Sequence, residues 1–111
     1  MSIITLTTDL GYRDPYLAIV KARLLSQNPM QQIVDLSCEI KGNNISDAAF
    51  IIKNSLPYFP KDTIHLVAVK FIVDRSNPDK NNTIDNSRYL LTRYKEQYIV
   101  CPDNGLLTLI D

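Results

Sequence analysis

The sequence has no tryptophan, one histidine, two cysteines and three glycines among its 111 residues. Cys38, His65 and Cys101 stand at no metal-binding spacing, so we predict no metal site. Two isolated thiols are typical of a reducing compartment, and residues 1–5 begin a strand at once instead of a basic and apolar leader. Both features favour a cytoplasmic protein.

An excess of charge of either sign is also absent. Twelve basic side chains are balanced by twelve acidic ones. The chain therefore produces no net field that would attract nucleic acid or a membrane surface, and it has no apolar run long enough to span a bilayer. Its length and its 45% apolar content suit one small domain over residues 1–111.

Apolar runs alternate with Pro, Gly, Asn and Asp in an order that predicts strands and helices in turn. The expected elements are a strand over 3–8, a helix opened by Asp14-Pro15 and stopped by Asn28-Pro29, a strand over 32–37, a helix over 44–56, a strand over 63–70, a polar loop over 74–87 and a hairpin of 87–93 with 97–101. This order implies a three-layer-like α/β domain whose mostly parallel sheet ends in an antiparallel edge.

Each predicted helix has one apolar face. In the first helix it is formed by Leu17, Val20, Leu24 and Leu25, and in the second by Ile45, Ala48, Ala49 and Ile52. A turn over 102–105 follows the hairpin, and residues 106–110 are apolar again. That last segment either docks tightly or precedes a domain that this chain lacks.

Ligands of open parallel sheets bind beyond the carboxyl ends of the strands, which here precede residues 9–16, residues 37–44 and Lys70. Asp9 and Asp14 share the first of these loops. Two carboxylates and a single glycine would repel phosphate, so the loop favours a ribose diol or a cation. The alternatives are structural: Asp14 as a helix cap, and Asp9 as a turn residue that bonds its own backbone.

Three stretches resemble the S-adenosylmethionine hydroxide adenosyltransferases, the family that includes the fluorinase and the chlorinase: ITLTTDLGYRDPYLAIVKARLLSQNPMQQIVDLSCEI, DAAFIIKNSLPYFPKDTIHLVAV and CPDNGLLTLI. The resemblance implies that S-adenosylmethionine is the substrate, with no cofactor, and that water displaces methionine to leave adenosine. It also implies a homotrimer in which the ligand lies between this N-terminal domain and the C-terminal domain of a neighbouring subunit. That second domain is absent from this chain.

Carried over by position, the resemblance assigns substrate-binding roles to Asp9, Asp14, Tyr16 and Asn43. Asp9 matches the acid that holds the ribose hydroxyls. Asp14 matches the contact to the methionine amino group, and Tyr16 lines the same end. Asn43 falls where halogenating relatives place an aromatic residue beside the ribose. Cys38 replaces a histidine of many relatives, and we expect it to serve packing.

The third strand departs from the family pattern. Hydrolases of the family continue with Val-Asp-Pro-Gly-Val-Gly and an arginine, whereas Lys70 occupies the position of that catalytic Asp here. A charged Lys70 about 4 Å from the sulfonium would cost about 4 kcal/mol at an effective dielectric near 20. Asp74 and Arg75 can take the place of the family's Asp and arginine only if the strand runs on or bulges. Otherwise Lys70 loses its proton in a dry pocket, or points toward Asp74 or solvent.

Three functions remain open at this point. The first is the substrate-binding domain of a hydrolase, and the second is a degenerate domain that binds adenosine or a related nucleoside without turnover. The third is a structural domain that contributes to an oligomer.

Overall fold

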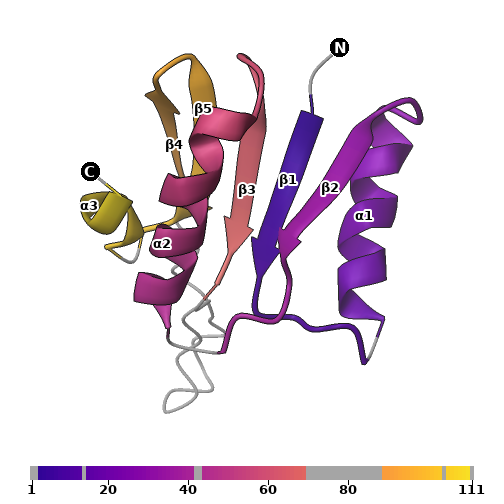
Figure 1. Ribbon diagram of the computed structural model, residues 1–111. Coiled ribbons are helices and arrows are strands. Elements are labelled where there is room, and N and C mark those ends of the chain that lie inside the picture. The colour runs from indigo at the N-terminus through magenta and orange to yellow at the C-terminus, as the bar shows by residue number, and fades with distance from the viewer. Residues whose placement is uncertain (1–2, 14, 42–43, 70–88, 104, 111) are drawn as a thin grey trace, which may run out of the picture.

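The computed structural model describes residues 3–13, 15–41, 44–69, 89–103 and 105–110 (Figure 1). The predicted loop over 74–87 lies outside the described residues. In chain order the elements are β1 (Ile3–Thr8), α1 (Tyr16–Gln27), β2 (Gln32–Ser37), α2 (Ile45–Ser55), the 3₁₀ turn η1 (Leu56–Tyr58), β3 (Ile64–Ala68), β4 (Tyr89–Tyr94), β5 (Gln97–Pro102) and α3 (Leu106–Ile110).

One five-stranded sheet has the order β2-β1-β3-β5-β4. The neighbours β2, β1, β3 and β5 pair in parallel, and only β4 runs antiparallel, against β5. In the parallel part, Ile4 lies between Ile33 of β2 and Ile64 of β3. The predicted fold class, a mostly parallel sheet with an antiparallel edge hairpin, is confirmed.

The two longer helices cover opposite faces of this sheet. Leu17 and Leu24 of α1 pack with Leu6, Cys38 and Leu66 on one face. The other face carries α2 and α3, whose contacts are Ala48, Ala49, Ile52, Leu106 and Ile110 against Val67, Ile99 and Cys101. Alternate residues of β3 face the two layers, so this central strand is apolar on both sides.

The predicted apolar faces of both helices pack on the sheet, except that Val20 of α1 is only half-buried, outside the core clusters, and Leu25 is exposed. Leu25 is 37% exposed, although it was expected in the apolar stripe of α1. At about 100° per residue, Leu25 projects some 80° away from Leu17 around the helix axis, and the sheet does not reach that far. The prediction for Leu25 was therefore wrong, while Leu17 and Leu24 pack as expected.

Local signals explain where the helices begin. Asn44 caps α2 by accepting a hydrogen bond from the backbone N–H of Asp47 at 3.0 Å. In α1, Pro15 occupies the cap position and accepts from the backbone N–H of Ile19 at 2.9 Å. We expected Pro15 to be the first residue of this helix, and the helix begins one residue later, at Tyr16. Within the described part of the chain, no helix combines the length and hydrophobicity that crossing a membrane requires.

The segment after the hairpin is the short helix α3. Leu106 and Ile110 are buried against α2, so the apolar residues 106–110 dock on the domain. Gly105, at φ 90°, makes the turn into this helix.

Candidate functional site

The carboxyl ends of β1, β2 and β3 meet at one edge of the sheet (Figure 1). Backbone hydrogen bonds fix the chain that leaves β1 at this edge. The N–H of Asp9 donates to the carbonyl of Ala68 at 3.3 Å, and that of Gly11 donates to the carbonyl of Cys38 at 2.7 Å. Gly11 has φ 72°, a conformation that glycine adopts without strain. The loop after β1 is therefore held between the ends of both neighbouring strands.

Two of the predicted site residues are described, and both lie at this edge. Asp9 directly follows β1 and is half-buried, and Tyr16 is the first residue of α1, with 60% of its surface exposed. Asp14, Asn43 and Lys70 lie outside the described residues. The binding roles of Asp9, Asp14, Tyr16 and Asn43, and the catalytic position of Lys70, stay predictions.

Tyr89 is a further residue of this edge that the sequence did not identify. It begins β4 and pairs with Pro102 at the carboxyl end of β5. Burial is the main cause that raises its pKa to about 12, and the charges of Cys101 and Asp9 add to the effect. The field of the Asp9 carboxylate thus reaches the Tyr89 hydroxyl. Only the hairpin register, which pairs the start of one strand with the end of the other, could have indicated this.

A second polar group joins the loop after β1 to α1 and β2. The Tyr12 hydroxyl donates to Oδ2 of Asp35 at 3.0 Å, while Nζ of Lys21 lies 2.9 Å from Oδ1 and 3.0 Å from Oδ2. The hydrogen bond to Asp35 is the main cause that raises the pKa of Tyr12. Because Tyr12 holds its proton and Asp35 has two donors, this group orders the loop after β1.

The two cysteines are free and buried on opposite faces of the sheet. Burial raises the pKa of Cys38, and it raises that of Cys101 to about 11, with a further contribution from the Asp103 charge. Both thiols therefore stay protonated near neutral pH and are poor nucleophiles. Cys38 packs with Leu6 and Leu17, as expected.

His65 is fully buried in the middle of β3. Its Nδ1 lies 2.7 Å from Oγ1 of Thr5, and its Nε2 lies 2.7 Å from Oε1 of Gln97. Both ring nitrogens are therefore used within the core. Among the residues that the structure describes, no group of three or more His, Cys, Asp or Glu side chains could hold a metal.

The chemistry of the edge follows from Asp9. A half-buried carboxylate at a fixed backbone position can accept hydrogen bonds from two neighbouring hydroxyls, which is the geometry of a ribose diol. It also attracts a cationic ligand. The edge can thus orient a polar, positively charged molecule, and the described residues there include no activated nucleophile.

Comparison with known proteins decides the family. Residues 4–111 match the family model described as the SAM hydroxide adenosyltransferase N-terminal domain. The chain belongs to this family.

Two curated relatives carry the name (R)-S-adenosyl-L-methionine hydrolase. The one from Methanocaldococcus jannaschii is 32% identical over 114 residues, which cover 99% of this chain and 40% of the relative. The one from Thermus thermophilus is 30% identical over 102 residues, with 92% of this chain and 36% of the relative covered. The chain thus spans about 40% of the length of these relatives or less.

Solved structures of similar proteins share the fold. An uncharacterized conserved protein from Thermotoga maritima superposes with a TM-score of 0.79 at 28% identity, over 97% of this chain and 38% of the other. A conserved hypothetical protein from Thermus thermophilus gives a TM-score of 0.72 at 30% identity, over 98% and 41% of the two chains.

Proposed function

We propose that this chain is the S-adenosylmethionine-binding domain of an enzyme that hydrolyses S-adenosylmethionine to adenosine and methionine. The observation that carries the proposal is Asp9, the acid of the family-like TTDLG stretch, fixed at the carboxyl-end edge by its backbone bond to Ala68. The family match over residues 4–111 and the two relatives named hydrolase support it.

In the proposed reaction, water attacks the ribose 5′ carbon. A C–O bond forms, the C–S bond breaks with its electron pair moving to sulfur, and the proton of the water passes to solvent. The sulfonium is already a good leaving group, so the reaction requires no metal or cofactor. The protein's contribution is to align the water with the C–S bond and to exclude bulk solvent.

Each predicted residue has a place in this proposal. Asp9 holds the ribose hydroxyls, and Asn43 lies beside the ribose. Asp14 and Tyr16 bind the methionine end, where the carboxylate of Asp14 pairs with the ammonium group.

A second candidate is a domain that binds the nucleoside without turning it over. The observation in its favour is Lys70, which stands where hydrolases of the family have their catalytic Asp. Without that acid, no residue of this chain is assigned to orient the attacking water.

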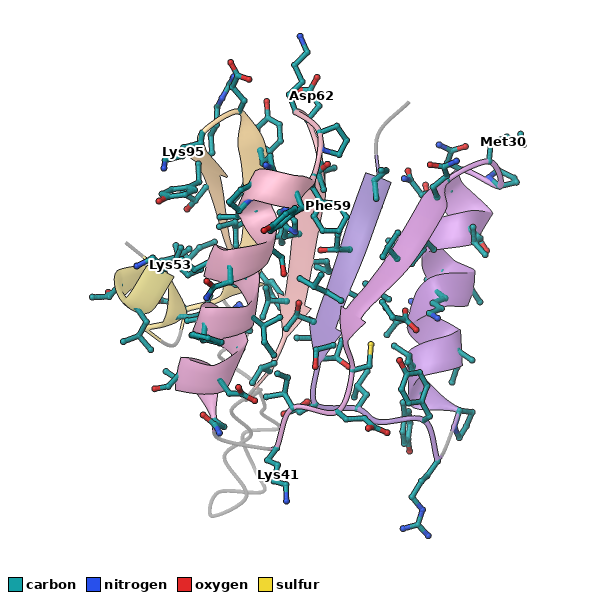
Figure 2. All side chains as sticks on the ribbon, viewed as in Figure 1. Met30, Lys41, Lys53, Phe59, Asp62 and Lys95 are labelled. Carbon is teal, nitrogen blue, oxygen red and sulfur yellow. The ribbon has the colours of Figure 1, made fainter. Side chains whose placement is uncertain are left out.

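Two measurements separate the candidates. Isothermal titration calorimetry of the chain with S-adenosylmethionine and with adenosine tests binding. Chromatography of the products formed when the C-terminal domain is supplied to the chain tests hydrolysis. Asp9→Asn should weaken adenosine binding about tenfold, because a neutral amide is a poorer acceptor for a diol. Asp62→Asn, at the opposite edge of the sheet, is the matched control (Figure 2). Binding that Asp9→Asn leaves unchanged would reject this site.

We further propose a cytoplasmic homotrimer, on the resemblance and on the free, buried cysteines. Large apolar side chains that remain exposed, Phe50, Tyr58 and Leu91, support burial in an assembly. Since the resemblance places the ligand between two domains, the 111-residue chain alone should hydrolyse little S-adenosylmethionine. Light scattering gives the oligomeric state, and robust adenosine release by this chain would contradict the shared pocket.

A further inference from the structure

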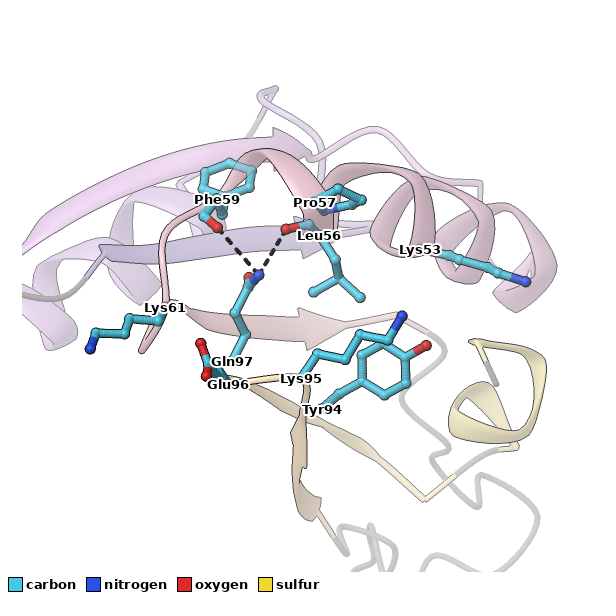
Figure 3. A pocket seen from close by; sticks show the side chains of 9 residues that line it. All are labelled: Lys53, Leu56, Pro57, Phe59, Lys61, Tyr94, Lys95, Glu96 and Gln97. Atoms are coloured by element: carbon cyan, nitrogen blue, oxygen red, sulfur yellow. Dashed lines mark hydrogen bonds between the residues drawn. The ribbon is translucent and has the colours of Figure 1, made fainter.

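A cavity of about 400 Å³ lies between η1, the end of α2 and the turn that joins β4 to β5 (Figure 3). Its volume is within the range of small-molecule sites. Gln97 begins β5 and Phe59 precedes β3, so the cavity is at the amino ends of these strands, whereas Asp9 is at the carboxyl edge. The five residues of β3 span about 16 Å between the two places. The cavity is therefore separate from the candidate site.

Gln97 holds this cavity in shape. Its side chain is 6% exposed, and Nε2 donates to the carbonyls of Leu56 at 2.7 Å and Phe59 at 3.3 Å (Figure 3). Oε1 lies 2.7 Å from Nε2 of His65. These bonds tie η1 to β5 and to the core. Leu56 and Pro57 of η1, which form the apolar wall of the cavity, therefore cannot collapse onto β5. The bonds also use the whole amide, so Gln97 has no donor left for a ligand.

The side chains that line the cavity carry more positive than negative charge. Three lysines and one glutamate line it, although the whole chain has no net charge. Lys53, Lys95 and the Tyr94 hydroxyl lie on one side of the cavity in Figure 3, and Lys61 and Glu96 lie on the other. Nζ of Lys95 is 5.4 Å from the centroid of the Tyr94 ring. One side of the cavity thus presents two ammonium groups and a hydroxyl donor.

The backbone conformation of the turn that joins β4 to β5 also points to this cavity, independently of the charges. Lys95 has φ 50° and Glu96 has φ 70°, the left-handed conformation of a two-residue hairpin turn. Asn-Gly adopts this turn with little strain, whereas Lys and Glu do so at a conformational cost. The turn therefore carries charge at the edge of the cavity in a place where local folding favours neutral residues.

We propose that this cavity binds a small anionic molecule with a flat apolar body, of the class of aromatic phosphates and carboxylates. The anionic group is held by Lys53, Lys95 and the Tyr94 hydroxyl. The body lies against Leu56 and Pro57. Both lysines are exposed, so the attraction is screened by salt and affinity falls as ionic strength rises.

The test is a titration of the ¹⁵N-labelled chain with 1-naphthyl phosphate, followed by NMR. Neutral 1-naphthol and cationic 1-naphthylmethylamine are the matched probes. We expect the phosphate to bind at least about tenfold more tightly than either, with shifts centred on Lys53 and residues 94–97. Raising NaCl from about 20 to about 300 mM should weaken it at least about threefold.

Variants locate the site. The double variant Lys53→Gln with Lys95→Gln should lower the affinity for 1-naphthyl phosphate about tenfold, and Tyr94→Phe should lower it about twofold. Lys41→Gln removes the same charge at the opposite edge of the sheet and should change affinity less than about twofold (Figure 2). All of these side chains are exposed or half-exposed, and the dispersion of each spectrum verifies folding. No binding, equal binding of 1-naphthol, shifts centred elsewhere, or a double variant with unchanged affinity would each overturn the proposal. The assay contains no S-adenosylmethionine, so it is independent of the proposed hydrolase.

Discussion

Nε2 of His65 lies 2.7 Å from Oε1 of Gln97 in the core of the domain. Because Nε2 of Gln97 donates to the carbonyls of Leu56 and Phe59, its Oε1 must accept, and the ring proton of His65 is on Nε2. Nδ1 then accepts from the Thr5 hydroxyl at 2.7 Å. The network fits a neutral imidazole in one tautomer.

Stability should therefore depend on pH through His65. Burial lowers the pKa of His65 in the folded chain below its ordinary value of about 6.5. As pH falls below about 6.5, the unfolded chain binds a proton first, so the free energy of unfolding decreases until the pH reaches the lower folded-state pKa. Urea denaturation between about pH 7.5 and 5 measures this slope. His65→Gln should flatten the profile, and a wild-type profile already as flat would contradict the prediction.

Replacing Gln97 should cost more than replacing an exposed glutamine. Gln97→Ala leaves the carbonyls of Leu56 and Phe59 and the N–H of His65 without their partner, which we expect to lower the free energy of unfolding by about 2 to 4 kcal/mol. Gln32→Ala, at an exposed position of a strand, should cost less than about 0.5 kcal/mol. Equal urea midpoints for the two variants would show that the network contributes little.

The Tyr12–Asp35 hydrogen bond should be visible in a titration. Asp35→Asn removes the charged acceptor that raises the pKa of Tyr12, so the phenol should ionise at lower pH. NMR of the chain with ¹³C-labelled tyrosine measures this pKa directly. Asp62→Asn removes a carboxylate at the other edge of the sheet and should leave it unchanged (Figure 2). A pKa of Tyr12 that is the same in Asp35→Asn as in the wild type would mean that the hydrogen bond does not persist in solution.

Local pattern was enough to predict much of the fold. The strands over 3–8 and 32–37 have the predicted bounds, because β-branched residues between turn signals select them. The apolar residues 106–110 were not assigned, since five such residues fit a strand or a helix equally well. Their helical state is accompanied by burial of Leu106 and Ile110 against α2, which no local signal contains.

Tertiary contacts explain why parts of the site were missed. Asp9 could be placed at the carboxyl edge because it directly follows a predicted strand. The field of Asp9 at Tyr89 depends on strand order, and the Tyr12–Asp35 bond joins residues 23 apart in sequence. The bonds that hold His65 likewise involve a residue 60 positions away and another 32 away. Spacing alone does not encode such pairs.

Lys70 provides the sharpest test of the sequence interpretation, because there the family pattern and this chain disagree. It lies outside the described residues, so the prediction rests on its position after the third strand. A charged Lys70 that faces S-adenosylmethionine repels both the sulfonium and the ammonium group. Lys70→Asp removes that repulsion and adds attraction, so it should tighten S-adenosylmethionine binding by at least about tenfold.

Calorimetry with the wild-type chain and with Lys70→Asp measures this change, and adenosine, which carries no positive charge, is the matched ligand. We expect adenosine affinity to change less than about threefold, because adenosine offers no cation for the introduced carboxylate to attract. A change below about threefold for S-adenosylmethionine as well would mean that Lys70 points to solvent, where screening weakens both the repulsion and the attraction. Weaker binding of S-adenosylmethionine in the variant would mean that Lys70 makes a favourable contact. That result would count against S-adenosylmethionine as the natural ligand and would favour a domain that binds a nucleoside without turnover.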